Sequence, residues 1–317
     1  MTANNHPPKV PVLFIIFNRK DRALESFQPI KRYRPNKLYI AADGPRDNKT
    51  NETELCKTTR NAILEEINWD CEVHTLFREK NVGCGRGVSE AISWMFETEE
   101  YGIINEDDCL ACDDFFLFCE ELLPRYKNDE QIAQINGFDM KYAEKSSNTY
   151  FFTSYPEIWG WATWKRAWVN IDFKMEEFPH IKKMIWKRFC FKEALIHYYL
   201  WNRLYKHIQK GEKIYAWGFQ WSIYVFMQNK LCINPKANLI INTGFGSGTN
   251  CKNSDTPLAK AKYGSLSFPL LHPAVIKTNS YNERIRSKEY VAVYKSVLLS
   301  KIKRIIKNIF HKNEKSN

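Results

Sequence analysis

The feature that most constrains the fold is a short apolar segment, Tyr101 to Ile104, that leads through Asn105 into three consecutive acids, Glu106-Asp107-Asp108. The apolar segment predicts a buried strand. Three adjacent carboxylates repel one another and cannot share a dry core, so we expect a cation to compensate them at the C-terminal end of that strand. A hard divalent ion shared with a diphosphate meets this requirement. The alternative is a solvated acidic turn.

The first third of the chain alternates between predicted strands and predicted helices. Strands are expected at 12–17, 38–42, 72–77 and 103–104, and helices at 22–32, 53–67, 86–99 and 113–126. This alternation predicts an α/β fold with right-handed crossovers and a mostly parallel central sheet flanked by helices. Ligands of such sheets bind outside the C-terminal strand ends, where Asn18-Arg19, Asp43-Gly44 and Glu106-Asp107-Asp108 all fall.

Size and charge narrow the classes of partner. A chain of 317 residues can bury a full core, and a formal net charge of +11 favours anionic partners such as nucleotides, phosphates, nucleic acid or an acidic membrane. Nucleic acid is the least favoured of these, because the cations form no recognised nucleic-acid motif. An acidic turn would also repel phosphate unless a cation is bound there.

The opening segment and the cysteines favour a cytoplasmic protein. Residues 1–9 are polar and contain proline, unlike a signal peptide, and no apolar run approaches membrane-spanning length. Nine cysteines without small-domain spacing favour reduced thiols. Cys109 and Cys112 form a C-x-x-C without a second pair, so a zinc site is not expected.

The C-terminal segment, 276–317, differs in character from the rest. It places apolar residues on one helical stripe with lysines and arginines around it, which favours a helix lying on an anionic membrane surface over residues 285–312. A terminal helix docked on its own domain explains the pattern equally well. The stripe consists of Val291, Tyr294, Leu298, Ile302, Ile305 and Ile309.

Several motifs occur in the order found in glycosyltransferases of the GT-A fold. They are Phe17-Asn18-Arg19, Ala42-Asp43-Gly44-Pro45, Asn81-Val82-Gly83, Glu106-Asp107-Asp108, Asp114-Phe115-Phe116, the tryptophan-rich block 159–168, the W-x-x-Q-W at 217–221 and the G-S-G-T at 246–249. The chain resembles bacterial relatives of the N-acetylglucosaminyltransferase I family. The resemblance implies a GT-A (Rossmann-like) domain over 1–275, with a donor-binding half at about 10–140, an aromatic-rich acceptor half at 141–275 and a basic C-terminal helix beyond.

The resemblance assigns the acids to a nucleotide-sugar donor, most simply a UDP-sugar. Asp108 would ligate Mn²⁺ or Mg²⁺, and Asp107 would act on the ribose or through metal-bound water. Glu106 would orient the turn, and Asp43 would accept the imide proton of uracil.

Other residues of these motifs would surround the donor. Asn18 and Gly44 belong to the donor motifs, and Gly83 would allow close approach of backbone to phosphate. Arg19 and Arg86 either reach phosphate or ribose or are ordinary surface cations.

The sequence departs from the family pattern on the acceptor side. Gly218 stands where relatives usually carry an aspartate, the presumed base, and Asn250 stands where many carry a histidine. Asp139 and Glu157 are the candidate substitutes for the base, although either could instead cap a turn or pair with an arginine.

Four tryptophans, Trp159, Trp161, Trp217 and Trp221, either stack on sugar faces or pack in the core, and core packing is favoured for at least half of them. They flank a helical stretch expected over 187–209, whose His197 and His207 we expect to be structural.

The sequence therefore predicts a metal-dependent glycosyltransferase of hexosyl or N-acetylhexosaminyl type. It would act on a glycan or lipid-linked acceptor in bacterial surface glycan synthesis, peripherally at the inner face of the cell membrane. The rival interpretation, based on Gly218 and Asn250, is a catalytically weakened nucleotide-sugar-binding or scaffold protein of the same fold.

Overall fold

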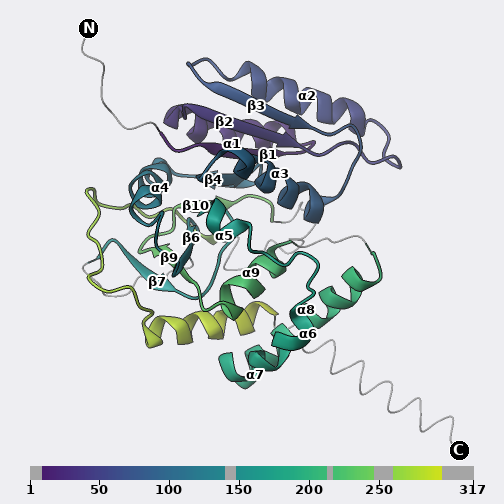
Figure 1. The fold of residues 1–317 in the computed structure, drawn as a ribbon. Coiled ribbons are helices and arrows are strands. Elements are labelled where there is room, and N and C mark those ends of the chain that lie inside the picture. Colours follow the sequence, from purple (N-terminus) through teal and green to yellow (C-terminus); the bar gives the residue numbers. More distant parts are fainter. Residues whose placement is uncertain (1–8, 140–147, 213–216, 246–259, 295–317) are drawn as a thin grey trace, which may run out of the picture. The chain divides into compact units, whose positions relative to one another are not determined.

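The computed structural model describes residues 9–139, 148–212, 217–245 and 260–294. By compactness the chain divides into two units (Figure 1). The first comprises the described residues up to 171 together with those from 217 to 278, and the second comprises 172–212 and 279–294. This division groups 172–212 with the C-terminal residues, whereas the sequence suggested one domain over 1–275.

An eight-stranded sheet forms the core of the first unit. Its strand order is β3-β2-β1-β4-β8-β6-β9-β7, and β5 pairs with β10 in a separate two-stranded sheet. The strands are β1 (Val12–Ile16), β2 (Lys37–Ala42), β3 (Glu72–Phe77), β4 (Tyr101–Glu106), β5 (Cys109–Ala111), β6 (Ile132–Asn136), β7 (Tyr150–Thr153), β8 (Trp161–Trp164), β9 (Leu231–Pro235) and β10 (Ile240–Asn242).

The sheet confirms the predicted α/β class and adds an antiparallel part. β3, β2, β1 and β4 are mutually parallel, as is the pair β6 and β9. β8 runs antiparallel to both β4 and β6, and β7 runs antiparallel to β9. β8 comes from the tryptophan-rich block, whose residues gave no strand alternation in the sequence.

Four helices cover the parallel part: α1 (Lys20–Tyr33), α2 (Glu52–Glu65), α3 (Cys84–Thr98) and α4 (Asp113–Arg125). α1 buries Ala23, Phe27 and Ile30 at helical spacing, and it ends at Arg34 in the left-handed conformation. α1 packs against α2, while α3 contacts β1, β2 and β4. Right-handed crossovers put α1 and α2 on one face and α3 on the other, because the strand order reverses direction after β3.

The reversal of strand order lies between β1 and β4. The chain proceeds from β1 outward to β2 and β3, and then returns to place β4 on the other side of β1. The register pairs Ile15 with Glu106 and Ile16 with Ala42. The residues that follow β1, β2 and β4 therefore meet at one edge of the sheet, which is where open α/β sheets bind ligands.

Three of the four tryptophans considered for sugar stacking lie in the core. Trp161 and Trp221 are 0% exposed and Trp217 is 3% exposed. The Trp161 ring centroid lies 5.7 Å from that of Trp217 and 5.4 Å from that of Trp221. Core packing is therefore confirmed for these three, and Trp159 remains half-buried between Phe138 and Phe245.

The second unit is helical. It contains α6 (Phe178–Ile181), a 3₁₀ turn at Lys182–Met184, α7 (Ile185–Arg188), α8 (Phe191–Gln209) and a helix over 280–294. His197 is buried, with its ring 4.2 Å from that of Phe189 and 4.4 Å from that of Tyr290. Burial, opposed by Glu193, lowers the pKa of His197. This histidine is neutral and structural, as expected.

The described part of the C-terminal segment docks on this unit. Tyr290 stacks on His197, and Ser287 donates a hydrogen bond to Glu193 at 2.5 Å. These contacts favour the docked interpretation for 280–294, while 295–312 lie outside the described residues. In the described part of the chain, no helix has the length and apolar character needed to cross a bilayer.

Gly137 gives a test of the packing around β6. A Cβ there would lie 2.4 Å from the Gly160 carbonyl oxygen and 2.7 Å from Phe115 Cε2, so we expect Gly137→Ala to destabilise the protein by about 2 kcal/mol or more. Gly218→Ala is the matched control, because its Cβ would meet only the flexible end of Ile158. Thermal unfolding measures both variants, and equal midpoints would contradict the packing described here.

Candidate functional site

The backbone of the acidic turn is fixed from three directions. The Asp107 N–H donates to the Ile15 carbonyl at 3.0 Å, which extends the β1–β4 pairing past the end of β4. Ser26 Oγ of α1 donates to the Asp107 carbonyl at 3.0 Å. Asn105 Nδ2 donates to the Cys109 carbonyl at 2.8 Å across the turn. The three acids are therefore held at the edge where β1, β2 and β4 end.

Arg19 is the cation that the structure brings to these acids. It is the N-cap residue of α1, and its Nη2 contacts Asp107 Oδ1 and lies 3.2 Å from Asp108 Oδ2. One guanidinium thus bridges two carboxylates. The sequence predicted that a cation compensates the acidic turn. Among the described residues, Arg19 of the chain itself is such a cation.

A single arginine leaves the site with surplus negative charge. Burial, reinforced by Asp108 and Asp107, raises the pKa of Glu106 to about 8. Burial also raises the pKa of Asp107 to about 6, against the opposing effect of Arg19. Asp107 Oδ2 is buried and accepts no hydrogen bond from the residues that the structure describes. The site therefore favours a further cation.

The turn after β10 packs closely against Asp108. The Thr243 N–H donates to the Asp108 carbonyl at 2.8 Å, and a Cβ on Gly244 would lie 2.5 Å from Asp108 Oδ2. A side chain at position 244 would thus collide with this carboxylate. The sequence analysis did not single out Gly244, and the only signal there is that it begins a glycine-rich stretch, Gly244 to Thr249.

The residues present fit a divalent ion shared with a ligand better than an ion held by protein alone. Within the described ranges, no three His, Cys, Asp or Glu side chains converge on one point. Mg²⁺-like ions are commonly held by one or two carboxylates, with water and substrate phosphates completing the shell. The unsatisfied oxygen of Asp107 and the partly exposed Asp108 supply such carboxylates.

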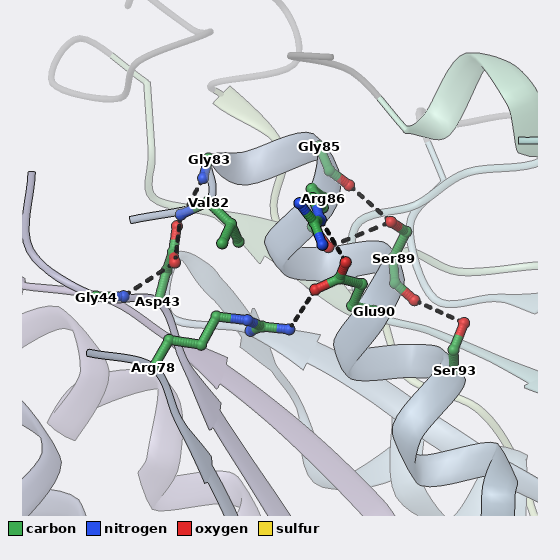
Figure 2. Close-up of polar contacts among 10 residues, drawn as sticks. All are labelled: Asp43, Gly44, Arg78, Val82, Gly83, Gly85, Arg86, Ser89, Glu90 and Ser93. Carbon is green, nitrogen blue, oxygen red and sulfur yellow. Dashed lines mark hydrogen bonds and ion pairs between the residues drawn. The ribbon is translucent and has the colours of Figure 1, made fainter. Parts of the chain in front are cut away.

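Asp43 organises the turn that precedes α3 (Figure 2). Its carboxylate accepts hydrogen bonds from the N–H groups of Gly44, Val82 and Gly83 at 2.9, 3.0 and 2.9 Å. Gly83 has φ of +87°, which favours glycine, and a Cβ on Gly44 would lie 2.4 Å from Lys80 backbone atoms. The structure thus brings the Asp43 and Gly83 motifs together, while the uracil-binding role of Asp43 stays a prediction.

The two arginines assigned to the donor differ in their surroundings. Arg19 lies against the acids, whereas Arg86 is exposed on the first turn of α3 and pairs with Glu90 one turn further along (Figure 2). Arg78 Nη2 contacts the same Glu90 at 3.1 Å. The phosphate-binding role of Arg86 stays a prediction, and it would require the Arg86 side chain to leave Glu90.

Asn18 connects the end of β1 to an ion pair between exposed Arg46 and buried Glu52 that the sequence did not reveal. Its Nδ2 donates to Glu52 Oε1 at 2.9 Å, and the Glu52 carboxylate also pairs with Arg46. Hydrogen bonds from Arg46 are the main cause of the lowered pKa of Glu52, although burial opposes them. Glu52 thus fastens the loop after β2 beside the end of β1.

Cys84 is a further residue that the sequence analysis did not single out. It begins α3 and keeps some surface exposure, yet loss of solvent around the thiol, followed by the charges of Glu106 and Asp108, raises its pKa to about 12. The side chain is therefore a neutral thiol beside the acids and not a thiolate nucleophile.

The acceptor-side candidates lie on neighbouring segments. Gly218 begins α9 (Gly218–Met227), and a Cβ on it would lie 2.7 Å from Ile158 Cδ1. Glu157 directly precedes Ile158, and its N–H donates to Asn136 at 3.2 Å. Asp139 is buried, and its N–H donates to Asn238 at 3.0 Å. The segment of Glu157 therefore lies against Gly218, and Asn250 falls outside the described residues.

No family model matches the sequence. No curated protein matches it either. Among solved structures, the chain is similar to galactosyltransferase LgtC in complex with donor and acceptor sugar analogues, with 10% identity, 70% of this chain and 72% of that chain covered, and a TM-score of 0.33. The chain is also similar to mouse xyloside xylosyltransferase 1, with 11% identity, 68% of this chain and 81% of that chain covered, and a TM-score of 0.33. A third similar structure is UDP-glucose pyrophosphorylase complexed with UDP-glucose, with 10% identity, 72% of this chain and 90% of that chain covered, and a TM-score of 0.33. Structural similarity at TM-scores this low does not establish a function for this chain. The α/β class is established by the sheet described above.

The raised pKa of Glu106 predicts a pH dependence of stability. A carboxyl group whose folded pKa lies above its unfolded pKa stabilises the fold when protonated. The free energy of unfolding of the metal-free protein should therefore decrease as the pH rises from 4.5 to about 8. The slope from this one group is at most about 1.4 kcal/mol per pH unit. Unfolding at several pH values should show a flatter profile for Glu106→Gln than for the exposed control Glu97→Gln. Identical profiles would contradict the burial of this charge.

Proposed function

We propose that the protein is a glycosyltransferase that takes its sugar from a nucleotide-sugar donor, with UDP as the nucleotide. The observation that carries this proposal is the convergence of Arg19, Asp43 and the Glu106-Asp107-Asp108 turn at the strand-order reversal. That edge is where α/β sheets bind nucleotides, and the order of the motifs matches the GT-A pattern.

Each part of the donor has a chemically suitable group at this edge. Arg19 would bind the diphosphate, exchanging one carboxylate partner for phosphate oxygens. Asp43 would accept the imide N–H of uracil, and Asp107 would orient the ribose. Asp108 would hold Mn²⁺ or Mg²⁺, which when bound neutralises the charge that the diphosphate gains on leaving. Glu106 would orient the acidic turn.

Glycosyl transfer passes through an oxocarbenium-like transition state, and an inverting enzyme needs one carboxylate to deprotonate the acceptor hydroxyl. Gly218 cannot take that proton. We assign the role to Glu157, because its segment packs against the Gly218 position, and keep Asp139 as the second candidate. The half-buried Trp159 is the remaining tryptophan of the four for contact with a sugar face.

The acceptor is proposed to be a glycan or a lipid-linked glycan of the bacterial surface. The segment 285–312 would then hold the enzyme at the inner face of the membrane. Of this segment, the described residues up to 294 pack on the second unit through Tyr290, so contact with lipid would fall to the residues beyond.

Donor binding is tested by thermal unfolding with UDP, with and without Mn²⁺. Saturating UDP and Mn²⁺ together should raise the unfolding midpoint by about 5 °C or more, and either one alone should raise it less. Asp108→Asn should remove the joint effect. The exposed Asp70→Asn is the control, because Asp70 precedes β3 at the opposite edge of the sheet. A joint effect that survives in Asp108→Asn would remove Asp108 as the metal ligand.

Catalysis is tested by UDP release from a panel of UDP-sugars. Glu157→Gln should lower the rate by about a hundredfold or more while leaving UDP-dependent stabilisation unchanged, because a general base acts only in the transition state. Gly218→Asp should leave the rate within a few-fold.

The reverse outcome would favour the rival function. An unaffected Glu157→Gln, together with a large gain in Gly218→Asp but not in Gly218→Asn, would mean that the natural chain lacks a competent base. The protein would then be a weakened nucleotide-sugar-binding protein of the same fold.

A further inference from the structure

The second unit carries an exposed group of apolar side chains next to the start of α8. Met184 is 42% exposed, Trp186 is 43% exposed and Phe191 is 71% exposed. Exposed aromatic residues grouped on one surface commonly mark an interaction site, whereas isolated ones need no explanation.

These side chains form one cluster held by the fold. The Trp186 ring centroid lies 6.1 Å from that of Phe191 and 5.7 Å from that of Tyr198. α7 packs against α8 (Figure 1), and Ile185, between Met184 and Trp186, is 0% exposed. Burial of Ile185 anchors α7, so its two neighbours stay at the surface.

The segment that carries the cluster is rich in cations and contains no acid. From Phe178 to Lys192 the sequence contains Lys182, Lys183, Lys187, Arg188 and Lys192, and no Asp or Glu. All of these except the half-buried Lys182 are exposed. We call Lys183, Met184, Trp186, Lys187, Phe191 and Lys192 the aromatic–basic patch.

We propose that the aromatic–basic patch binds the surface of an anionic lipid bilayer. Aromatic rings insert at the level of the headgroups, and lysines beside them gain attraction to anionic lipid. The patch has both chemistries on a short segment. The proposal concerns the second unit alone and does not depend on donor binding or glycosyl transfer.

The same composition argues against protein partners. Lysine is depleted from the buried centre of protein interfaces, but here lysines alternate with the aromatic residues. A two-fold contact between two copies would place like charges opposite one another. A bilayer satisfies the rings and the cations at the same time.

The test uses the full-length protein and sedimentation with vesicles of phosphatidylglycerol or of phosphatidylcholine. The wild type should bind the first and not the second. Lys183→Gln/Lys187→Gln/Lys192→Gln should lower partitioning by about a hundredfold, since each cation near such a surface contributes about fivefold. Trp186→Ser/Phe191→Ser should lower it by roughly tenfold.

Matched controls alter the first unit instead. Lys49→Gln/Lys57→Gln/Lys127→Gln removes exposed lysines, and Leu55→Ser/Leu117→Ser removes exposed apolar side chains. Both should bind as the wild type does. Brominated phosphatidylglycerol should quench less tryptophan fluorescence in Trp186→Phe than in the wild type, because Trp186 contacts the lipid directly.

Any of four outcomes would overturn the proposal. In the first, the wild type does not bind phosphatidylglycerol vesicles. In the second, it binds phosphatidylcholine equally well. In the third, the patch variants bind as well as their controls do, and the fourth is dimerisation through the patch. The third would assign membrane binding to another segment, including 295–317. Concentration-dependent dimerisation that is lost in Trp186→Ser/Phe191→Ser would assign the patch to a second copy of the chain.

Discussion

The contact of Arg19 with Asp107 and Asp108 determines how this site can work. It connects the start of α1 with the end of β4, across the point where the strand order reverses. Without it, adjacent carboxylates would repel one another at a partly buried edge. With it, one guanidinium faces two of the three carboxylates, and burial, reinforced by Asp108 and Asp107, still raises the pKa of Glu106. An unsatisfied acidic edge of this kind suits a ligand that brings a cation and a polyanion together.

The fold separates the two signs of charge that the sequence mixes. The net charge of +11 favoured an anionic partner in general, but the candidate donor site is acidic. A segment with five cations and no acid lies instead between Lys182 and Lys192 in the second unit. Two different anions are therefore proposed for two places. A diphosphate would bind the first unit through Arg19 and a metal ion, and a bilayer would bind the second through lysines and aromatic rings.

The sequence predicted the parallel half of the fold and much less of the rest. Apolar runs and crossover rules located β1 to β4 and brought Asp43 and Asp107 to one edge. The antiparallel strand β8 escaped prediction because its four residues, Trp161 to Trp164, are all buried and show no alternation of apolar and polar side chains. The hydrogen bonds of Asp43 could not be predicted from the sequence either, because its partners are backbone N–H groups whose positions only the folded turn determines. The base stays a prediction, because the position expected from the resemblance to carry an aspartate is Gly218, which cannot take a proton.

The most direct measurement is a crystal structure of the protein with UDP and Mn²⁺, using anomalous scattering to locate the metal. The account predicts one anomalous peak within coordination distance of an Asp108 oxygen and of the UDP diphosphate. It also predicts that the uracil lies beside Asp43 and that Arg19 contacts phosphate. A nucleotide bound elsewhere, or no metal beside Asp107 and Asp108 in crystals containing UDP, would contradict it.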